Sequence, residues 1–259
     1  MQSQDHKGDL NEIQYKKRLP DKSIADFVEC FWMVENATGI EKEVVVMPDA
    51  NFDLVLSKDA GEPFQISLLG LGTLYGKREV EANTKMFLIS FKLLALEYLF
   101  HRSIAGLLNE FQPLPNDFWN FEEADLNDFE AFSVKASDKI KSLIPASIDR
   151  RKENLFGLIY ASNGEMTVAE LAEQSFWSSR QINRYFTQYF GLSLKTYCSI
   201  LRFKASFVQI KKGELFPELN FSDQAHFSRE VKKLSGVNPK ELHRNENGRF
   251  IQISAISKK

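Results

Sequence analysis

Thr167–Gly191 reads TVAELAEQSFWSSRQINRYFTQYFG, and this stretch decides the fold of the second half of the chain. Thr167 and a glutamate three residues later form a capping-box pattern, which predicts the start of a short helix. Ser178 or Ser179 is expected to cap a second helix, whose apolar residues recur at helical spacing, and Gly191 is placed to end it. Two short helices joined by a tight turn, the second with a polar and cationic face, are typical of a helix-turn-helix.

The polar face of the second helix carries the residue types that DNA reading requires. A helix fits the major groove, where Arg can make two hydrogen bonds to guanine and Asn or Gln can read adenine. Residues near the helix N-terminus contact base edges, and hydroxyls and amides at the helix start contact phosphates. An ordinary helical hairpin with a solvated polar face is the alternative that this segment alone leaves open.

A long apolar stripe follows at Ser193–Lys212 and predicts a helix that could hold two DNA-reading units at a fixed separation. After it, Phe221–Arg244 reads FSDQAHFSREVKKLSGVNPKELHR. Ser222 is expected to cap a helix in this stretch, Gly236 to end it and Pro239 to start another. The pattern predicts a second recognition helix.

Arg180–Tyr197 and Phe221–Leu242 together resemble the C-terminal DNA-binding domain of the AraC/XylS family of bacterial transcription regulators. The resemblance covers roughly residues 152–244. It implies two helix-turn-helix motifs bridged by the long helix, with recognition helices near 179–190 and 222–235 in successive major grooves, ~10 base pairs apart.

The resemblance also implies which residues contact DNA. Groove-facing or flanking positions of the first recognition helix are Arg180, Gln181, Asn183 and Arg184, and those of the second are Gln224, Ala225, His226 and Arg229. Phosphate contacts are expected from Ser179, Lys195 and Lys240. Phe227 and Leu234 match core positions.

One segment departs from the family pattern. Only Gly213–Asn220 is available for the first helix of the second motif, and Pro217 falls inside it. Because proline fits only the first turn of a helix, we expect a single turn at Pro217–Asn220. The shortening motivates an alternative function, a protein–protein adaptor whose helical half has lost DNA binding.

The first half of the chain has the alternating pattern of strands over residues 11–91, and its spacing becomes helical from Leu93 to Leu143. A linker is expected at Pro145–Ser147, and one further strand at Arg249–Ile253. We therefore predict an α+β fold: a strand-rich sensory or dimerisation domain, residues 1–145, with helices at its C-terminal end, followed by an all-α double helix-turn-helix domain, residues 146–259.

The first half also resembles an N-terminal domain often attached to such DNA-binding modules, on the residues of Met47–Ser57, the glycine loop around Gly70, and Ile89–Phe100. The resemblance implies a small-molecule effector, a homodimer and, for an activator, RNA polymerase as partners. Candidates for lining an effector pocket are Trp32, Phe52, Phe91 and Tyr98. Burial in a core built from 22 Phe residues is the competing interpretation.

The charge of the chain is divided between its halves. From Arg150 to Lys259 there are 18 Lys and Arg against 10 Asp and Glu, and the first 149 residues carry 15 and 25, so the net charges are +8 and −10. A basic half attracts phosphates, which indicates double-stranded DNA as its partner. Chance solvation of two surfaces is the alternative.

Several features that the sequence lacks narrow the expected cellular compartment and the chemistry of the protein. It has no apolar run of the ~18 residues that suggest a membrane span, its first residues do not resemble a secretory signal, and two lone cysteines suit a reducing cytoplasm. The histidines have no zinc spacing with either cysteine. Asp49 and Asp53 could be paired carboxylates, with turn capping by Asp49 as the competing interpretation. We expect no enzyme, catalytic residue, metal, cofactor or membrane contact.

Overall fold

Antiparallel strands make up the first half of the chain in the computed structural model, which describes residues 4–5, 13–59, 61–215, 221 and 223–256. One sheet has the strand order β1 (Gln4–Asp5), β2 (Gln14–Arg18), β3 (Val28–Asn36), β8 (Thr84–Phe91), β5 (Phe52–Lys58), β6 (Gln65–Leu69) and β9 (Phe111–Leu114). A separate ribbon pairs β4 (Lys42–Val46) with β7 (Gly76–Val80). β-Branched and aromatic residues fill the central strands, as a half-buried sheet favours.

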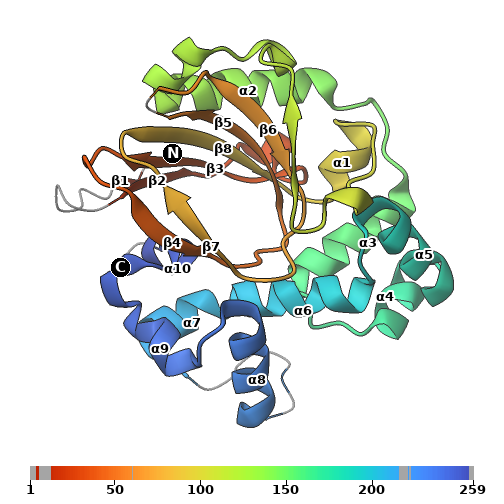
Figure 1. Cartoon of the computed structure of the whole chain (residues 1–259). Coiled ribbons are helices and arrows are strands. Elements are labelled where there is room, and N and C mark those ends of the chain that lie inside the picture. Colours follow the sequence, from red (N-terminus) through yellow and green to blue (C-terminus); the bar gives the residue numbers. More distant parts are fainter. Residues whose placement is uncertain (1–3, 6–12, 60, 216–220, 222, 257–259) are drawn as a thin grey trace.

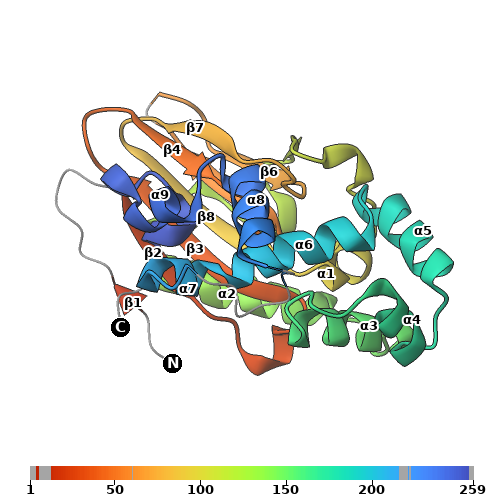
Figure 2. The same cartoon turned by 90° about the horizontal axis from the view of Figure 1, so that it is seen from below.

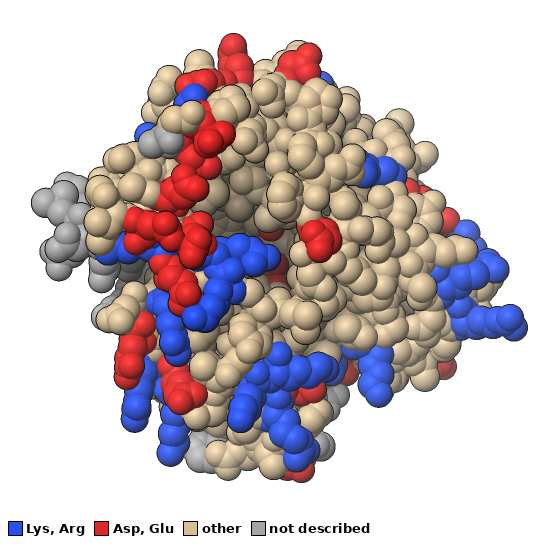
Figure 3. Space-filling view, viewed as in Figure 1, with Lys and Arg blue, Asp and Glu red and all other residues tan. Residues whose placement is uncertain are grey.

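The two faces of the sheet have different surroundings (Figure 1). Helix α2 (Phe129–Leu143) covers one face, where the ring of Phe132 lies 6.5 Å from that of Phe31 and 5.2 Å from that of Phe87. Side chains alternate along a strand, so Trp32 and its sheet neighbour Leu88 lie on the opposite face, where both stay half-buried. Figure 3 shows that the surface is hollowed between the sheet and the β4–β7 ribbon.

Short helices close the first half, and longer ones build the second. The first half contains η1 (Lys22–Ile24), α1 (Leu94–Tyr98), η2 (Ala105–Leu107), η3 (Phe118–Asn120), η4 (Glu123–Asn127) and α2. The second contains α3 (Arg150–Ala161), α4 (Val168–Gln174), α5 (Ser179–Phe190), α6 (Leu194–Ala205), α7 (Phe207–Lys212), α8 (Gln224–Ser235), α9 (Pro239–Arg244), η5 (Glu246–Gly248) and α10 (Ile251–Ser254). The predicted α+β fold, strand-rich and then all-helical, is confirmed.

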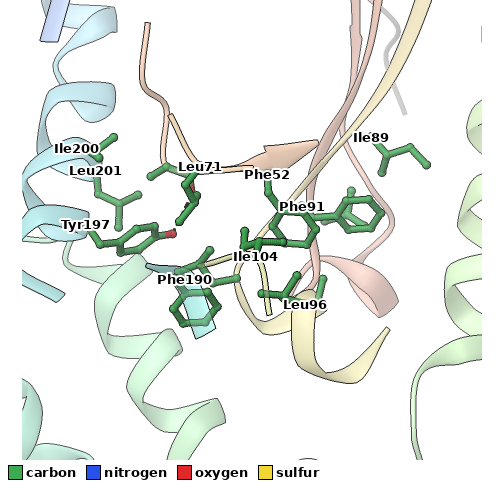
Figure 4. Close-up of a cluster of buried hydrophobic side chains, with 14 of the residues drawn as sticks. Phe52, Leu71, Ile89, Phe91, Leu96, Ile104, Phe190, Tyr197, Ile200 and Leu201 are labelled. Atoms are coloured by element: carbon green, nitrogen blue, oxygen red, sulfur yellow. Dashed lines mark hydrogen bonds between the residues drawn. The ribbon is translucent and has the colours of Figure 1, made fainter. Parts of the chain in front are cut away.

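The two halves share one hydrophobic core. Leu71 and Ile104 of the first half lie between Tyr197 of α6 and the aromatic side chains of the sheet (Figure 4). Tyr197 is fully buried, and its hydroxyl donates to the carbonyl of Ala50 at 3.0 Å. The predicted boundary at 145/146 falls in the segment between α2 and α3 and stays a prediction.

The sequence-based prediction of the bridging helix needs a correction. The stretch Ser193–Lys212 forms two consecutive helices, α6 and α7, because the chain makes a turn at Ser206. The buried apolar face shifts there, since Phe207 and Ile210 of α7 are buried whereas Val208 is 48% exposed.

The strand predicted at Arg249–Ile253 is wrong as well. Phe250 makes one isolated parallel bridge with Val45 of β4, and α10 begins directly after it. Phe250 is only 1% exposed, so its burial against the ribbon, rather than strand pairing, explains the apolar alternation at this point. The end of the helical half thereby packs on the first half.

Candidate nucleic-acid interface

Helix α5 has the capped and amphipathic form that its sequence predicts. Ser178 is its N-cap, and Gly191 ends it with a left-handed φ of 78°. Ile182, Phe186 and Phe190 are fully buried on one face. The helix preceding it, α4, begins with the predicted capping box of Thr167 and Glu170. The first helix-turn-helix is therefore locally specified at each of its ends.

The predicted contact residues of α5 differ in how available they are. Arg180 and Arg184 are exposed, and neither guanidinium has an ion-pair partner among the described residues. The side-chain oxygen of Gln181 accepts hydrogen bonds from Ser178 N at 3.0 Å and Ser178 Oγ at 2.8 Å, so it is used in the cap. Asn183 is half-buried and donates to the carbonyl of Ser179, also half-buried, at 3.0 Å. The two arginines are the side chains most available to DNA.

Helix α8 repeats this arrangement with a different cap. Its N-cap is Asp223, whose carboxylate accepts from the backbone N of His226 at 2.7 Å. Ser222, the predicted cap, lies outside the described residues, as does the single turn predicted at Pro217–Asn220. Of the predicted contacts, Gln224, Ala225 and Arg229 are exposed and His226 is half-buried with its ring 5.7 Å from that of Phe221. Phe227 and Leu234 are buried core residues.

The two units repeat at an interval of 45 residues, from Gly191 to Gly236. Both glycines end a predicted recognition helix, with φ of 78° and 79°. The next helix starts behind Ser193 in one unit and Asn238 in the other, and each of these caps the backbone N three residues later. The repeat is not visible as sequence identity, because few residues besides Arg184 and Arg229, and Lys195 and Lys240, are identical between the two units.

The repeat gives Lys195 and Lys240 equivalent places. Each lies at the second position of the helix that follows its recognition helix, and each is exposed. A helix N-terminus offers backbone N–H groups and a partial positive charge, which a neighbouring lysine reinforces toward a phosphate. This placement is consistent with contacts from both lysines to DNA phosphates, and that role stays a prediction.

Basic side chains gather where the two recognition helices lie. Figure 3 shows one group of Lys and Arg at the right-hand edge, over α5, and a second at the lower side, over α8, with most acidic side chains in a stripe over the strands. Helix α6 runs between the two units (Figure 1 and Figure 2). Further Lys and Arg side chains lie at the left of this view, among the acidic ones.

The four candidates for an effector pocket do not lie together. Phe52 and Phe91 are fully buried on the α2 side of the sheet, with ring centroids 5.3 Å apart. Tyr98, at the end of α1, contacts the start of the helical half, where its hydroxyl accepts from the backbone N of Asp149 at 3.0 Å. Of the four, Trp32 alone lies on the hollowed face of the sheet. It is half-buried there, with the ammonium of Lys17 4.9 Å from its ring centroid.

Titratable side chains gather at one end of this hollowed face. Lys204 of α6 pairs with Glu29 of β3 at 2.9 Å. Asp49 accepts from the backbone N of Asn51, which is the turn-capping role. Asp53 accepts from Ser90 Oγ at 2.5 Å. Burial and the nearby carboxylate of Asp49 raise the pKa of Asp53 to about 7.

Among the described residues, no three His, Cys, Asp or Glu side chains gather in a way that could hold a metal ion. None of the described helices has both the length and the apolar content for a membrane crossing.

Residues 16–113 match a family described as a domain of unknown function (DUF6597). No curated protein matches the chain. Among solved structures, an apo form of a single-residue variant of ToxT from Vibrio cholerae strain SCE256 is 13% identical, with a TM-score of 0.44 over 86% of this chain and 98% of that one. The unsaturated fatty acid-bound wild-type ToxT of the same strain is 13% identical, with a TM-score of 0.44 over 83% and 95%.

A transcriptional regulator from Chromobacterium violaceum, described by its AraC-type DNA-binding domain, is 22% identical, with a TM-score of 0.32 over 37% of this chain and 90% of that one. At these identities no role is transferred to a residue of this chain. The chain is thus similar to AraC-type transcription regulators, over most of its length in the case of ToxT.

Proposed function

We propose that the protein is a sequence-specific DNA-binding transcription regulator that reads two successive major grooves with α5 and α8. The observation that carries this proposal is the exposed polar face of α5, with Arg180 and Arg184 unpaired among the described residues on a helix capped at both ends. A rigid helix with free guanidinium groups has the chemistry to read guanine in the major groove.

The repeated unit supports the use of both helices. The two units repeat over 45 residues, with Arg184 and Arg229 at equivalent positions and exposed. Lys195 and Lys240 would fix the register on the phosphates without reading sequence. The binding would be salt-sensitive, because each neutralised phosphate releases counterions.

We further propose that residues 1–145 control this binding through a small-molecule effector, residues 146–259 being the DNA-binding domain. The hollowed sheet face, with Trp32 half-buried on it, supports the effector site, in place of the four-residue pocket. A homodimer and, for an activator, RNA polymerase complete the partners of this hypothesis, and no catalytic role is proposed.

The test is selection of duplexes from a random pool by the full chain at one stated, moderate salt concentration. Two half-sites ~10 base pairs apart would support the regulator with both units reading. No enrichment would reject it and favour the adaptor hypothesis. The effector hypothesis is tested separately by a thermal-shift screen, in which Trp32→Ala should abolish the shift of any compound bound at the hollowed face.

A further inference from the structure

The C-terminal end of α5 receives hydrogen bonds from the sheet half. A helix leaves its last carbonyls without donors of its own. Here the backbone N–H of Ile104 donates to the carbonyl of Tyr189 at 2.9 Å. The hydroxyl of Ser103 lies 2.8 Å from the carbonyl of Gln188 and 3.0 Å from that of Tyr189. A loop 85 residues earlier in the chain thus caps the recognition helix.

The packing at this point is as close as the backbone allows. A Cβ atom built on Gly191 would lie 2.6 Å from the carbonyl oxygen of Ala105, nearer than side-chain carbons approach. Ile104 is fully buried beside this contact. The loop and the end of α5 therefore fit each other without space for rearrangement.

Glu97 of α1 makes a second attachment to α5. Its Oε2 accepts from the hydroxyl of Tyr185 at 2.9 Å, and its Oε1 pairs with Lys152 of α3. The Lys152 ammonium lies 5.1 Å from the ring centroid of Tyr185. Burial and the Glu97 carboxylate raise the pKa of Tyr185, so its hydroxyl stays a donor at neutral pH.

These attachments leave the DNA side of α5 open. They involve the buried Tyr185 and the carbonyls at the helix end, whereas Arg180 and Arg184 stay exposed. The sheet half therefore orients the recognition helix and does not mask it. In the second unit, the equivalent Gly236 packs on the ring of Tyr75 of the sheet half, but among the described residues no hydrogen bond from that half reaches the last carbonyls of α8.

We propose that Glu97 and Ser103 are positioning residues for DNA reading by α5, holding this helix in the orientation in which Arg180 and Arg184 meet the first half-site. The inference rests on the proposed function and makes part of the sheet half a component of one DNA-reading unit. It predicts that base preference at the first half-site, and not at the second, depends on Ser103 and on the Tyr185–Glu97 hydrogen bond.

The experiment uses the full chain and the duplex it selects, with single-base changes introduced into each half-site in turn. Dissociation constants are compared for wild type, Ser103→Ala, Tyr185→Phe and the double variant at one salt concentration. Ser103→Thr keeps the hydroxyl and should restore wild-type behaviour. Ser142→Ala is the matched control, because Ser142 Oγ is exposed and donates within its own helix, to the carbonyl of Lys139.

Each single variant is expected to lose about fivefold (about 1 kcal/mol) in discrimination at the first half-site. Discrimination at the second half-site should not change. An equal loss of discrimination at both half-sites would overturn the inference, because it would mean that the effect is not confined to α5. A smaller folded fraction would weaken binding to every duplex by the same factor and leave discrimination unchanged. Unchanged preference in the double variant would overturn it too. If the wild type selected no duplex, the proposed function itself would fail, and the inference with it.

Discussion

The two units that we propose read DNA have the same local design and different supports. Each has an exposed arginine at an equivalent position, Arg184 and Arg229, and a left-handed glycine at the helix end. The end of α5 is capped by the sheet half through Ile104, whereas α8 is tied to the bridging helix by the Ser199–Glu230 hydrogen bond of 2.6 Å. Equivalent recognition helices can thus depend on different parts of one chain.

The largest expected difference comes from the cores behind the two helices. Phe186→Ala and Phe227→Ala each remove a fully buried ring and should each cost about 3–5 kcal/mol locally. The ring of Phe186 lies 5.7 Å from that of Tyr197, which bonds to Ala50 of the sheet half, so the loss of Phe186 should lower the free energy of unfolding of the whole chain. Phe227→Ala should mainly open α8 and α9. Denaturant titration combined with hydrogen exchange distinguishes unfolding of the whole chain from local opening of α8 and α9. Identical exchange patterns in the two variants would contradict the expected difference between them.

The matched arginines test the comparison at the DNA. Arg184→Ala and Arg229→Ala should each lose about 1–3 kcal/mol of base discrimination, and each in a different half-site. Competition binding with single-base variants of the selected duplex measures this. Loss in the same half-site for both variants would mean that the two helices do not read separate grooves.

The carboxylate of Asp53 tests the buried charged groups where the sheet meets α6, since Lys204 of that helix acts on it. Its pKa is about 7 in the folded chain against 3.8 ordinarily, so the folded state keeps a proton that the unfolded state releases. The contribution of Asp53 to stability should therefore be greatest at low pH and fall as pH rises from about 4 through 7. Asp49, Lys204 and Ser90 are the groups that act on it.

Asp53→Asn should remove this decline, which amounts to on the order of 2–3 kcal/mol between pH 5 and pH 8. Chemical denaturation between pH 5 and pH 8 measures it. Asp138→Asn is the control, because that carboxylate is on the exposed side of α2. The same pH profile in Asp53→Asn and wild type would contradict the assignment.

The smallest expected effect is in the turn of the first unit. Phe176 is 86% exposed and has a φ of 56°, a conformation that costs a bulky residue free energy. Phe176→Asn should stabilise the chain by about 0.5–1 kcal/mol, and Phe176→Leu should not, since it keeps the strain. A lower melting temperature for Phe176→Asn would show that the ring itself stabilises the turn.

Local signals predicted the helical half well. The Thr167–Glu170 capping box, the glycine at 191 and the buried face of α5 follow from spacing within one or two helical turns. The cap of α8 was assigned to Ser222, whereas Asp223 has the side chain that accepts the hydrogen bond. When two adjacent residues can both cap a helix, the sequence pattern does not indicate which of them makes the hydrogen bond.

The sequence pattern does not predict contacts between residues that are far apart in the chain. Nothing in the sequence near Ser103 indicates that its hydroxyl meets the end of a helix 85 residues later. The same limit explains the effector candidates, because alternation places Phe52 and Phe91 on the α2 face and Trp32 on the other, and the sequence does not say which face is covered.

The most direct test of the account is selection from a random duplex pool by the full chain, followed by reselection with Arg184→Ala and with Arg229→Ala. The account predicts two half-sites ~10 base pairs apart, each degraded by one of the two variants. A pool with no consensus, or a consensus that neither variant alters, would contradict it.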